Sequence, residues 1–175
     1  NKDGFKELAE QLPSGRKILY AIPEVITQPE GWQIQFEIKG LQFVYEGSKQ
    51  TKNDFENVMS LNTTYVQQMV DLARLTKPGP FGLKTIQFGS YFGIFDKDKL
   101  VAMTGQRLHA ENYSEISAVC THPDYTGKGF AYKLLQHQLQ IILHNGQQPF
   151  LHVREDNERA IKLYLRLGFT ISRPM

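Results

Sequence analysis

In the second half of the chain, apolar residues first form runs typical of β-strands. Segments with apolar residues three or four positions apart, as in an α-helix, then alternate with further strand-like runs. The polar turn at residues 96–99 separates the first two apolar runs and predicts a β-hairpin. Hairpin strands followed by alternating helices and strands are typical of an α/β fold with a mixed sheet. The pattern predicts strands over Tyr91–Phe95, Leu100–Leu108, Glu115–Thr121, Phe150–Val153 and Phe169–Ser172, and helices over Gly129–His144 and Asn157–Leu167. Asn157 is the expected N-cap of the second helix, and Gly168 is at its C-cap position.

The first half shows shorter periodic segments. Helical spacing predicts helices over Lys2–Leu12 and Asn62–Thr76, and Arg16–Ile22 reads as a short β-like run. Apolar residues alternate from Trp32 to Tyr45, which predicts strands with Gly40 as a turn or bulge between them. We therefore expect an N-terminal α/β half-domain over residues 1–61 that packs on a core domain of residues 62–175.

Composition narrows the class of protein. The 175 residues include 41% hydrophobic and 22% charged residues, which is typical of a folded domain. The net charge of +2, without a basic cluster, argues against nucleic acid as a partner. Neither a signal-peptide pattern nor an apolar run of about 20 residues is present, so no membrane association is expected. The single cysteine, Cys120, fits a reducing compartment, and we expect a cytoplasmic monomer or homodimer.

Residues 120–131 (CTHPDYTGKGFA) read as a strand end, a short turn and the start of a helix. Gly127 and Gly129 at such a junction let bare backbone N–H groups approach an anion, and the helix N-terminus adds positive potential. A P-loop would need an earlier glycine and a Ser or Thr after Lys128, and a dinucleotide fingerprint would need glycine in place of Tyr132. The final Gly-x-Ala instead fits a coenzyme A loop, so we expect a pyrophosphate as the ligand.

The segment Tyr113–Phe169 resembles the GNAT superfamily of N-acetyltransferases through two blocks, EISAVCTHPDYTGKGFAYKLL and PFLHVREDNERAIKLYLRLGF. The upstream LTKPGPFG and the hairpin after it resemble the branch related to the C-terminal domains of glycine N-acyltransferases. The resemblance implies a GNAT-like acetyltransferase fold, with acetyl-CoA as cosubstrate and no metal. It also implies direct acetyl transfer in a ternary complex to a primary amine, either a small molecule or a peptide. Because few residues follow Gly168, we expect the N-terminal segment or a partner to complete the sheet there.

An alternative function is a catalytically idle acyl-CoA-binding module that acts as a sensor or docking partner. Thr126 favours this alternative, since the family usually has Gln or Arg at the start of the loop. The resemblance implies cofactor-binding roles for loop and strand residues and for Asn157, two helical turns from Tyr164. These residues are Val119, Thr121, Thr126, Gly127, Lys128, Gly129, Ala131 and Asn157.

Acyl transfer from a thioester needs a neutral amine and a proton for the leaving thiolate. Tyr164 is the predicted general acid, with core packing as the competing interpretation. Glu115 is the predicted catalytic proton relay from the amine, with a solvated carboxylate at the sheet edge as the alternative. Cys120 lacks an adjacent base, so we expect a buried and inert thiol. His122 and His152 are expected to be hydrogen-bonded structural residues.

Overall fold

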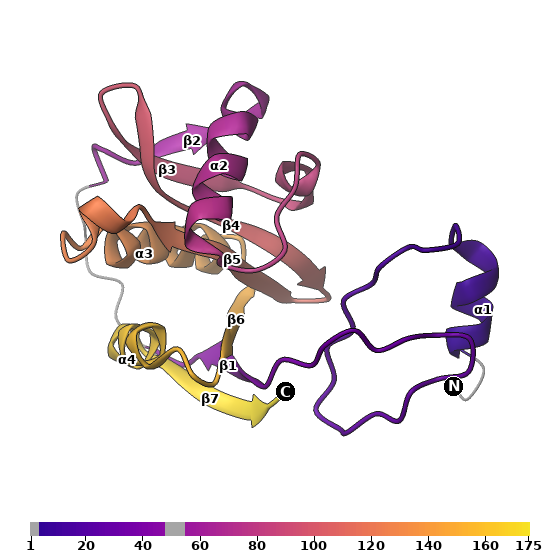
Figure 1. Ribbon diagram of the computed structural model, residues 1–175. Coiled ribbons are helices and arrows are strands. Elements are labelled where there is room, and N and C mark those ends of the chain that lie inside the picture. Colours follow the sequence, from indigo (N-terminus) through magenta and orange to yellow (C-terminus); the bar gives the residue numbers. More distant parts are fainter. Residues whose placement is uncertain (1–3, 48–54) are drawn as a thin grey trace.

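One mixed sheet in the order β2-β3-β4-β5-β6-β1-β7 runs through the computed structural model, which describes residues 4–47 and 55–175 (Figure 1). Neighbouring strands pair antiparallel, except that β5 and β6 are parallel. This confirms the predicted mixed α/β class. The strands are β1 (Gly40–Tyr45), β2 (Met59–Leu61), β3 (Tyr91–Asp96), β4 (Lys99–Ala110), β5 (Tyr113–Thr121), β6 (Gln148–Arg154) and β7 (Phe169–Pro174).

Helices cover both faces of this sheet. Side chains of α2 such as Met69 and Leu72 pack with Met103 and Cys120 on one face. On the other face, α3 and α4 pack against strand residues of β1, β5 and β6. The helices are α1 (Gly4–Gln11), α2 (Val66–Thr76), α3 (Phe130–His144) and α4 (Glu158–Leu167), with short 3₁₀ helices η1 (Thr63–Tyr65), η2 (Thr85–Phe88) and η3 (Pro123–Tyr125).

The elements predicted from residue 62 onward are present, with small shifts in their ends. The caps of α4 are the residues expected: Asn157 accepts a hydrogen bond from the Ala160 N–H at 3.1 Å, and Gly168 ends the helix at a φ of 99°. An Asn side chain satisfies an orphan N–H at a helix start, and glycine adopts the left-handed C-cap conformation without a Cβ penalty.

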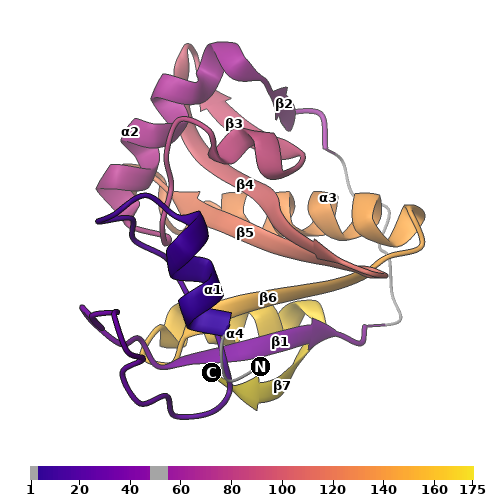
Figure 2. The same ribbon diagram turned by 90° about the vertical axis from the view of Figure 1, so that its right-hand side faces the viewer.

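The N-terminal prediction was wrong over Arg16–Ile22 and over residues 32–39, where the chain forms no strand. No strand within residues 4–47 and 55–175 pairs with these alternating residues, and the side chains of Phe36 and Ile38 remain exposed. Figures 1 and 2 place α1 and the segment after it on the side of the sheet away from α3 and α4. Trp32 holds this segment together by donating its indole N–H to the Phe5 carbonyl at 2.9 Å.

Strand β1 comes from the N-terminal part of the chain and lies between β6 and β7. Its backbone pairs with both neighbours, and Gly40 exchanges two backbone hydrogen bonds with Met175 at 2.9 and 2.8 Å. The expected completion of the sheet by the N-terminal segment is therefore confirmed. The division between residues 61 and 62 stays a prediction, although β1 and β2 from the first range both belong to the common sheet. Within the described ranges, no helix is both long and apolar enough to cross a membrane.

Candidate active site

Strands β5 and β6 form a wedge at the centre of the sheet. Their parallel pairing covers three residue pairs, from Tyr113–Gln148 to Glu115–Phe150, and no further pairs follow in the described residues. Ala118 has a φ of 53° within β5, close to a register shift against β4, as expected for a β-bulge. The facing backbone edges beyond Glu115 are therefore available to a ligand that carries amide groups.

The glycine loop lies at the open end of this wedge, between η3 and α3. Gly127 and Gly129 have φ values of 82° and 80°, and a Cβ at either position would meet no atom within 4 Å. Gly129 is the N-cap of α3 and brings no side chain to the first N–H groups of the helix. Those N–H groups have no acceptor inside the helix and add to its positive end. The geometry therefore suits a phosphate group, and phosphate binding by this loop stays a prediction.

A pocket of about 390 Å³ adjoins this loop. Five predicted cofactor residues line it: Thr121, Thr126, Gly127, Gly129 and Ala131. The Thr121 hydroxyl is buried without a hydrogen-bond partner among the described residues, so a ligand in the pocket could supply one. The remaining lining residues come from η3, α3 and α4: Tyr125, Phe130, Tyr132, Arg159, Lys162, Leu163 and Arg166.

The other predicted cofactor residues lie outside the pocket lining. Val119 packs against the core, and the Lys128 ammonium lies 4.6 Å from the centre of the Tyr125 ring. Asn157 precedes α4 as its N-cap, where its side chain accepts the hydrogen bond from the Ala160 N–H. The Thr126 hydroxyl donates to the Pro123 carbonyl at 2.9 Å and stabilises the turn. Ligand roles for these residues stay predictions.

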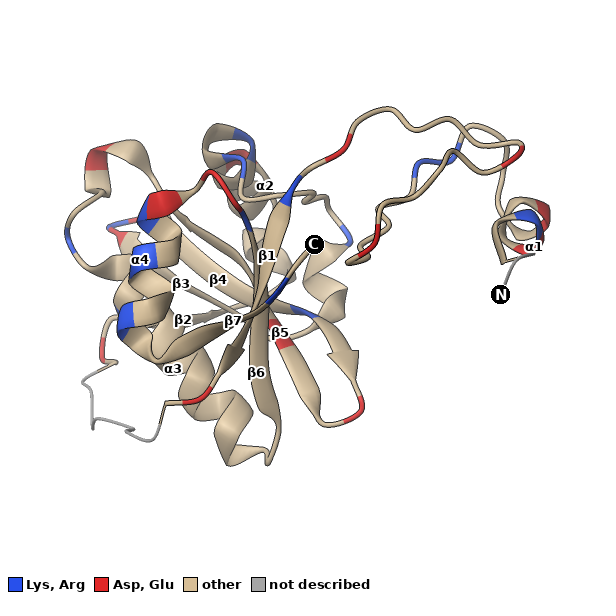
Figure 3. Ribbon diagram, turned by 90° about the horizontal axis from the view of Figure 1, so that it is seen from below, with Lys and Arg blue, Asp and Glu red and all other residues tan. Residues whose placement is uncertain are grey.

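A row of basic residues on α4 borders the pocket, and sequence reasoning missed it. Arg159, Lys162 and Arg166 follow one another at spacings of three and four, which place them on one helical face. Figure 3 shows basic positions recurring along α4. The Arg166 guanidinium lies 4.7 Å from the centre of the Tyr132 ring, on the neighbouring α3. The spacing was the available signal, and the row adds positive charge beside the glycine loop.

Tyr164 lies in the core between Phe43 and Phe169, with ring centroids 6.0 Å from each. Burial raises the pKa of its phenol well above the ordinary value, so the group keeps its proton at neutral pH. A protonated phenol can donate to a thiolate, and it also packs well as a core residue. The predicted acid role is therefore compatible with the packing and stays a prediction.

Four polar side chains form a row across the sheet face that lies away from α3 and α4. Arg107 of β4 makes two hydrogen bonds to Glu115 of β5, at 2.9 and 2.6 Å. The Glu115 carboxylate also lies 2.8 Å from Nδ1 of His152 on β6, and Nε2 of that histidine lies 3.2 Å from the amide nitrogen of Gln42 on β1. We call these four residues the polar row.

The Glu115 side chain is 1% exposed, so the alternative of a solvated edge carboxylate was wrong. Burial alone would raise the pKa of Glu115, but hydrogen bonds from His152 and Arg107 and their charges lower it below its ordinary value. The carboxylate is thus ionised at neutral pH. Its role as a proton relay stays a prediction, and His152 is hydrogen-bonded as expected.

Cys120 is buried on the α2 side of the sheet. Burial raises the pKa of its thiol to about 11, so the nucleophilic thiolate is a minor species at neutral pH. The described residues contain no group of three or more His, Cys, Asp and Glu side chains suited to a metal ion.

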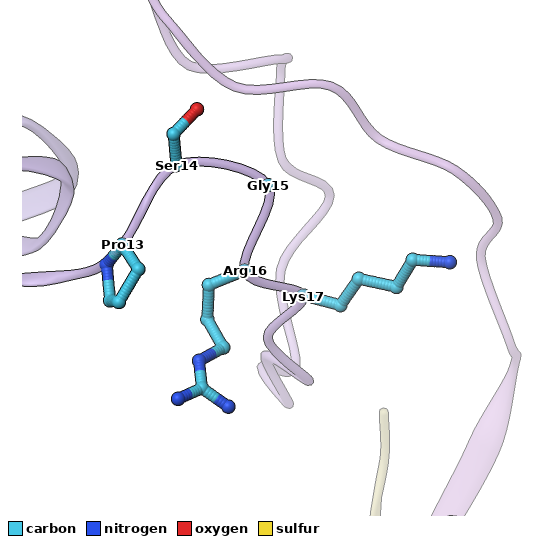
Figure 4. Close-up of a pocket in the computed structure, with 5 residues that line it drawn as sticks. All are labelled: Pro13, Ser14, Gly15, Arg16 and Lys17. Carbon is cyan, nitrogen blue, oxygen red and sulfur yellow. The ribbon is translucent and has the colours of Figure 1, made fainter.

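A second hollow, of about 470 Å³, lies at the turn Pro13 to Lys17 (Figure 4). These five consecutive residues make up its entire lining, and Arg16 and Lys17 are both exposed. Since no second element closes over the turn, the hollow has no enclosed volume in which to hold a ligand.

Comparison with known proteins assigns the fold to a family. Residues 91–173 match the FR47-like protein family. A solved GNAT-family protein from Novosphingobium aromaticivorans DSM 12444 is 34% identical, with a TM-score of 0.82, over 87% of this chain and 68% of its own. A coenzyme A complex of an N-acetyltransferase from Thermoplasma acidophilum shares the fold at 17% identity and a TM-score of 0.55, over 65% of this chain and 89% of its own.

A shorter match joins this chain to mycothiol acetyltransferase of Corynebacterium efficiens, with 31% identity over 80 residues. The match covers 45% of this chain and 27% of the relative, so the chain spans only about a quarter of that protein. The fold, the wedge with its glycine loop and the similarity over 68% of the Novosphingobium protein all point to the same family. The chain belongs to the GNAT superfamily of acetyltransferases.

Proposed function

We propose that this protein transfers an acetyl group from acetyl-CoA directly to a primary amine while both substrates are bound. The observation that carries the proposal is the loop at the start of α3, where two glycines with positive φ open onto a pocket lined by basic residues. The N–H groups of the first α3 turn would bind the pyrophosphate, and the open edges of β5 and β6 would bind the amides of the pantetheine arm.

The acetyl group would then lie at the wedge, between the polar row and α4. Tyr164 would return a proton to the departing thiolate, and the amine would lose its proton toward Glu115 and its neighbours in the polar row. The short match to mycothiol acetyltransferases supports acetyl transfer as the reaction, because those relatives are named as acetyltransferases.

The test is amine-dependent release of free thiol from acetyl-CoA across a panel of small amines and peptides, with the acetylated product identified by mass spectrometry. We expect turnover with at least one acceptor class and little thiol release without amine. Tight binding of CoA with no acceptor-dependent release would instead favour a binding module.

Direct transfer has a separate test at Cys120. Because its thiol is buried and largely protonated, Cys120→Ala should keep most of the turnover, and radiolabelled acetyl-CoA should leave no label on the denatured protein. A stable label at Cys120, or ping-pong kinetics that the substitution abolishes, would show a covalent route.

A further inference from the structure

The polar row lies at the apex of the wedge. Glu115 pairs with Phe150 at the last register position shared by β5 and β6, and His152 follows two residues later, where the strands separate. Neighbouring residues in a strand point to opposite faces. Because Leu151 and Ile116 pack on the side of α3 and α4, His152 and Glu115 occupy the opposite face.

The hydrogen bonds of the row determine the protonation of the His152 ring. Glu115 is ionised and can only accept, so the Nδ1 atom 2.8 Å away carries the hydrogen and donates it. In a neutral imidazole, Nε2 then holds the lone pair. The Gln42 amide nitrogen at 3.2 Å donates to that lone pair. A buried carboxylate that fixes the tautomer and leaves the far nitrogen basic is the arrangement found behind histidine bases in hydrolytic enzymes.

We propose that His152 is the base that removes a proton from the acceptor amine, with Glu115 as its positioning residue and Gln42 as the group that an incoming amine displaces from Nε2. This proposal rests on the proposed acetyl transfer. The side chain of His152 is 21% exposed, whereas that of Glu115 is 1% exposed, so of these two residues the histidine is the one that a substrate can reach. Arg107 binds both carboxylate oxygens and keeps Glu115 turned toward the histidine.

The chemical balance is simple. The bound ammonium gives one proton to Nε2 of His152, and the neutral amine attacks the thioester carbonyl. A C–N bond forms and the C–S bond breaks, the thiolate takes a proton from Tyr164, and the nitrogen loses its second proton. That proton restores the phenol through solvent, and the imidazolium returns its proton to solvent. The net products are an amide, free CoA thiol and one released proton.

The experiment is chemical rescue of His152→Ala with a series of substituted imidazoles, measured on the full chain with the best acceptor of the wild type. We expect kcat to fall by about 10²-fold or more, with CoA affinity unchanged by calorimetry. Added imidazole should restore turnover, and the restored rate should rise with the basicity of the imidazole. His144→Ala, at the exposed end of α3, is the control and should keep wild-type turnover without rescue.

Glu115→Gln provides the second readout. This variant keeps the shape of the polar row and removes the negative charge that stabilises the His152 imidazolium. We therefore expect kcat to fall and the acid limb of the pH profile of kcat to move to lower pH. Other ionisable groups near Glu115 and His152 are Arg107 and Tyr91, Arg154 two residues beyond His152 on β6, and Arg173 opposite Gln42 on β7. The acid limb should be unaffected in Tyr91→Phe.

Each failure has its own signature. A wild-type protein without amine-dependent thiol release would contradict the proposed function itself. An active wild type whose His152→Ala variant folds and keeps its turnover would overturn only the role of His152. A variant restored equally by weakly and strongly basic imidazoles would show that the ring merely fills space. If His152→Ala does not fold, His152→Gln, which can still hydrogen-bond to Glu115, provides the same comparison of kcat with CoA affinity.

Discussion

Gly127 and Gly129 hold left-handed backbone conformations in open space. A side chain at either position would not clash with a neighbouring atom, so steric crowding is not the reason for glycine there. What limits these positions is backbone strain, which costs about 1–3 kcal/mol for a residue with a Cβ held in such a conformation. The exposed N–H groups between them depend on that backbone geometry. The loop is therefore sensitive to substitution even though it makes few contacts.

Gly129→Val should weaken CoA binding by about 10-fold or more, because a β-branched residue tolerates a φ of 80° poorly and would redirect the start of α3. Calorimetric titration with CoA measures the effect. Gly15→Val is a matched control, since Gly15 has a φ of 77°, also meets no atom within 4 Å and lies in the N-terminal turn. An unchanged CoA affinity in a folded Gly129→Val protein would contradict the loop assignment.

Tyr164→Phe should slow the chemical step by about 10²-fold with little change in CoA affinity, because it removes the proton donor and keeps the aromatic packing with Phe43 and Phe169. Tyr45→Phe offers a control in the same core, where the Tyr45 ring also packs against Phe169. Steady-state kinetics with a good acceptor decide the matter. Equal turnover in both variants would reduce Tyr164 to a packing residue.

Sequence reasoning found residues whose role depends on local geometry. The glycine loop and the caps of α4 are fixed by neighbours within a few positions, so their spacing predicted them. The polar row is different, because Gln42 and His152 are 110 residues apart and meet only through strand pairing. Nothing near Glu115 in sequence distinguishes a buried ion pair from a solvated carboxylate. The pairing of four strands supplies that information.

At the scale of elements, the contrast between local and long-range contacts also separates the strands that were predicted correctly from those that were predicted wrongly. Residues 91–121 form strands because each run has an adjacent hairpin partner. Residues 32–39 alternate just as clearly and form none, and no strand in the described part of the chain pairs with them. The spacing of apolar residues shows which side chains would share one face of a strand. Whether the segment forms a strand depends on a partner strand that pairs with its backbone.

Helix α4 combines two functions on different faces, with Tyr164 in the core and the basic row beside the pocket. Changing Arg159, Lys162 and Arg166 singly to Gln should each raise the Kd for CoA by about two- to five-fold at low salt, because exposed ion pairs contribute up to about 1 kcal/mol. The effect should shrink as salt screens the charges. Arg74→Gln on α2 is the control. Salt-independent losses, or equal losses in the control, would contradict binding of phosphate by this row.

For the molecule as a whole, the residues that the fold requires begin at β1, and we expect the segment before β1 to be dispensable for folding. Removing residues 1–61 should prevent folding, because β1 lies between β6 and β7 and its Phe43 is fully buried. Removing residues 1–38 should leave a folded protein with unchanged CoA affinity. Circular dichroism, thermal melting and CoA titration of both truncations measure this. A well-folded protein without β1, or loss of CoA binding without residues 1–38, would contradict it.

The position of β1 also has a consequence for the order of folding. A ribosome completes β1 long before it makes β6 and β7, so this strand waits without partners while more than half of the chain is synthesised. Its apolar edge is a template for association between nascent chains during that interval. Folding from denaturant should therefore be slow for a domain of this size, since closing the sheet requires contacts of high sequence separation. Substitutions in β1 should lower the yield of native protein during expression more than they lower its equilibrium stability.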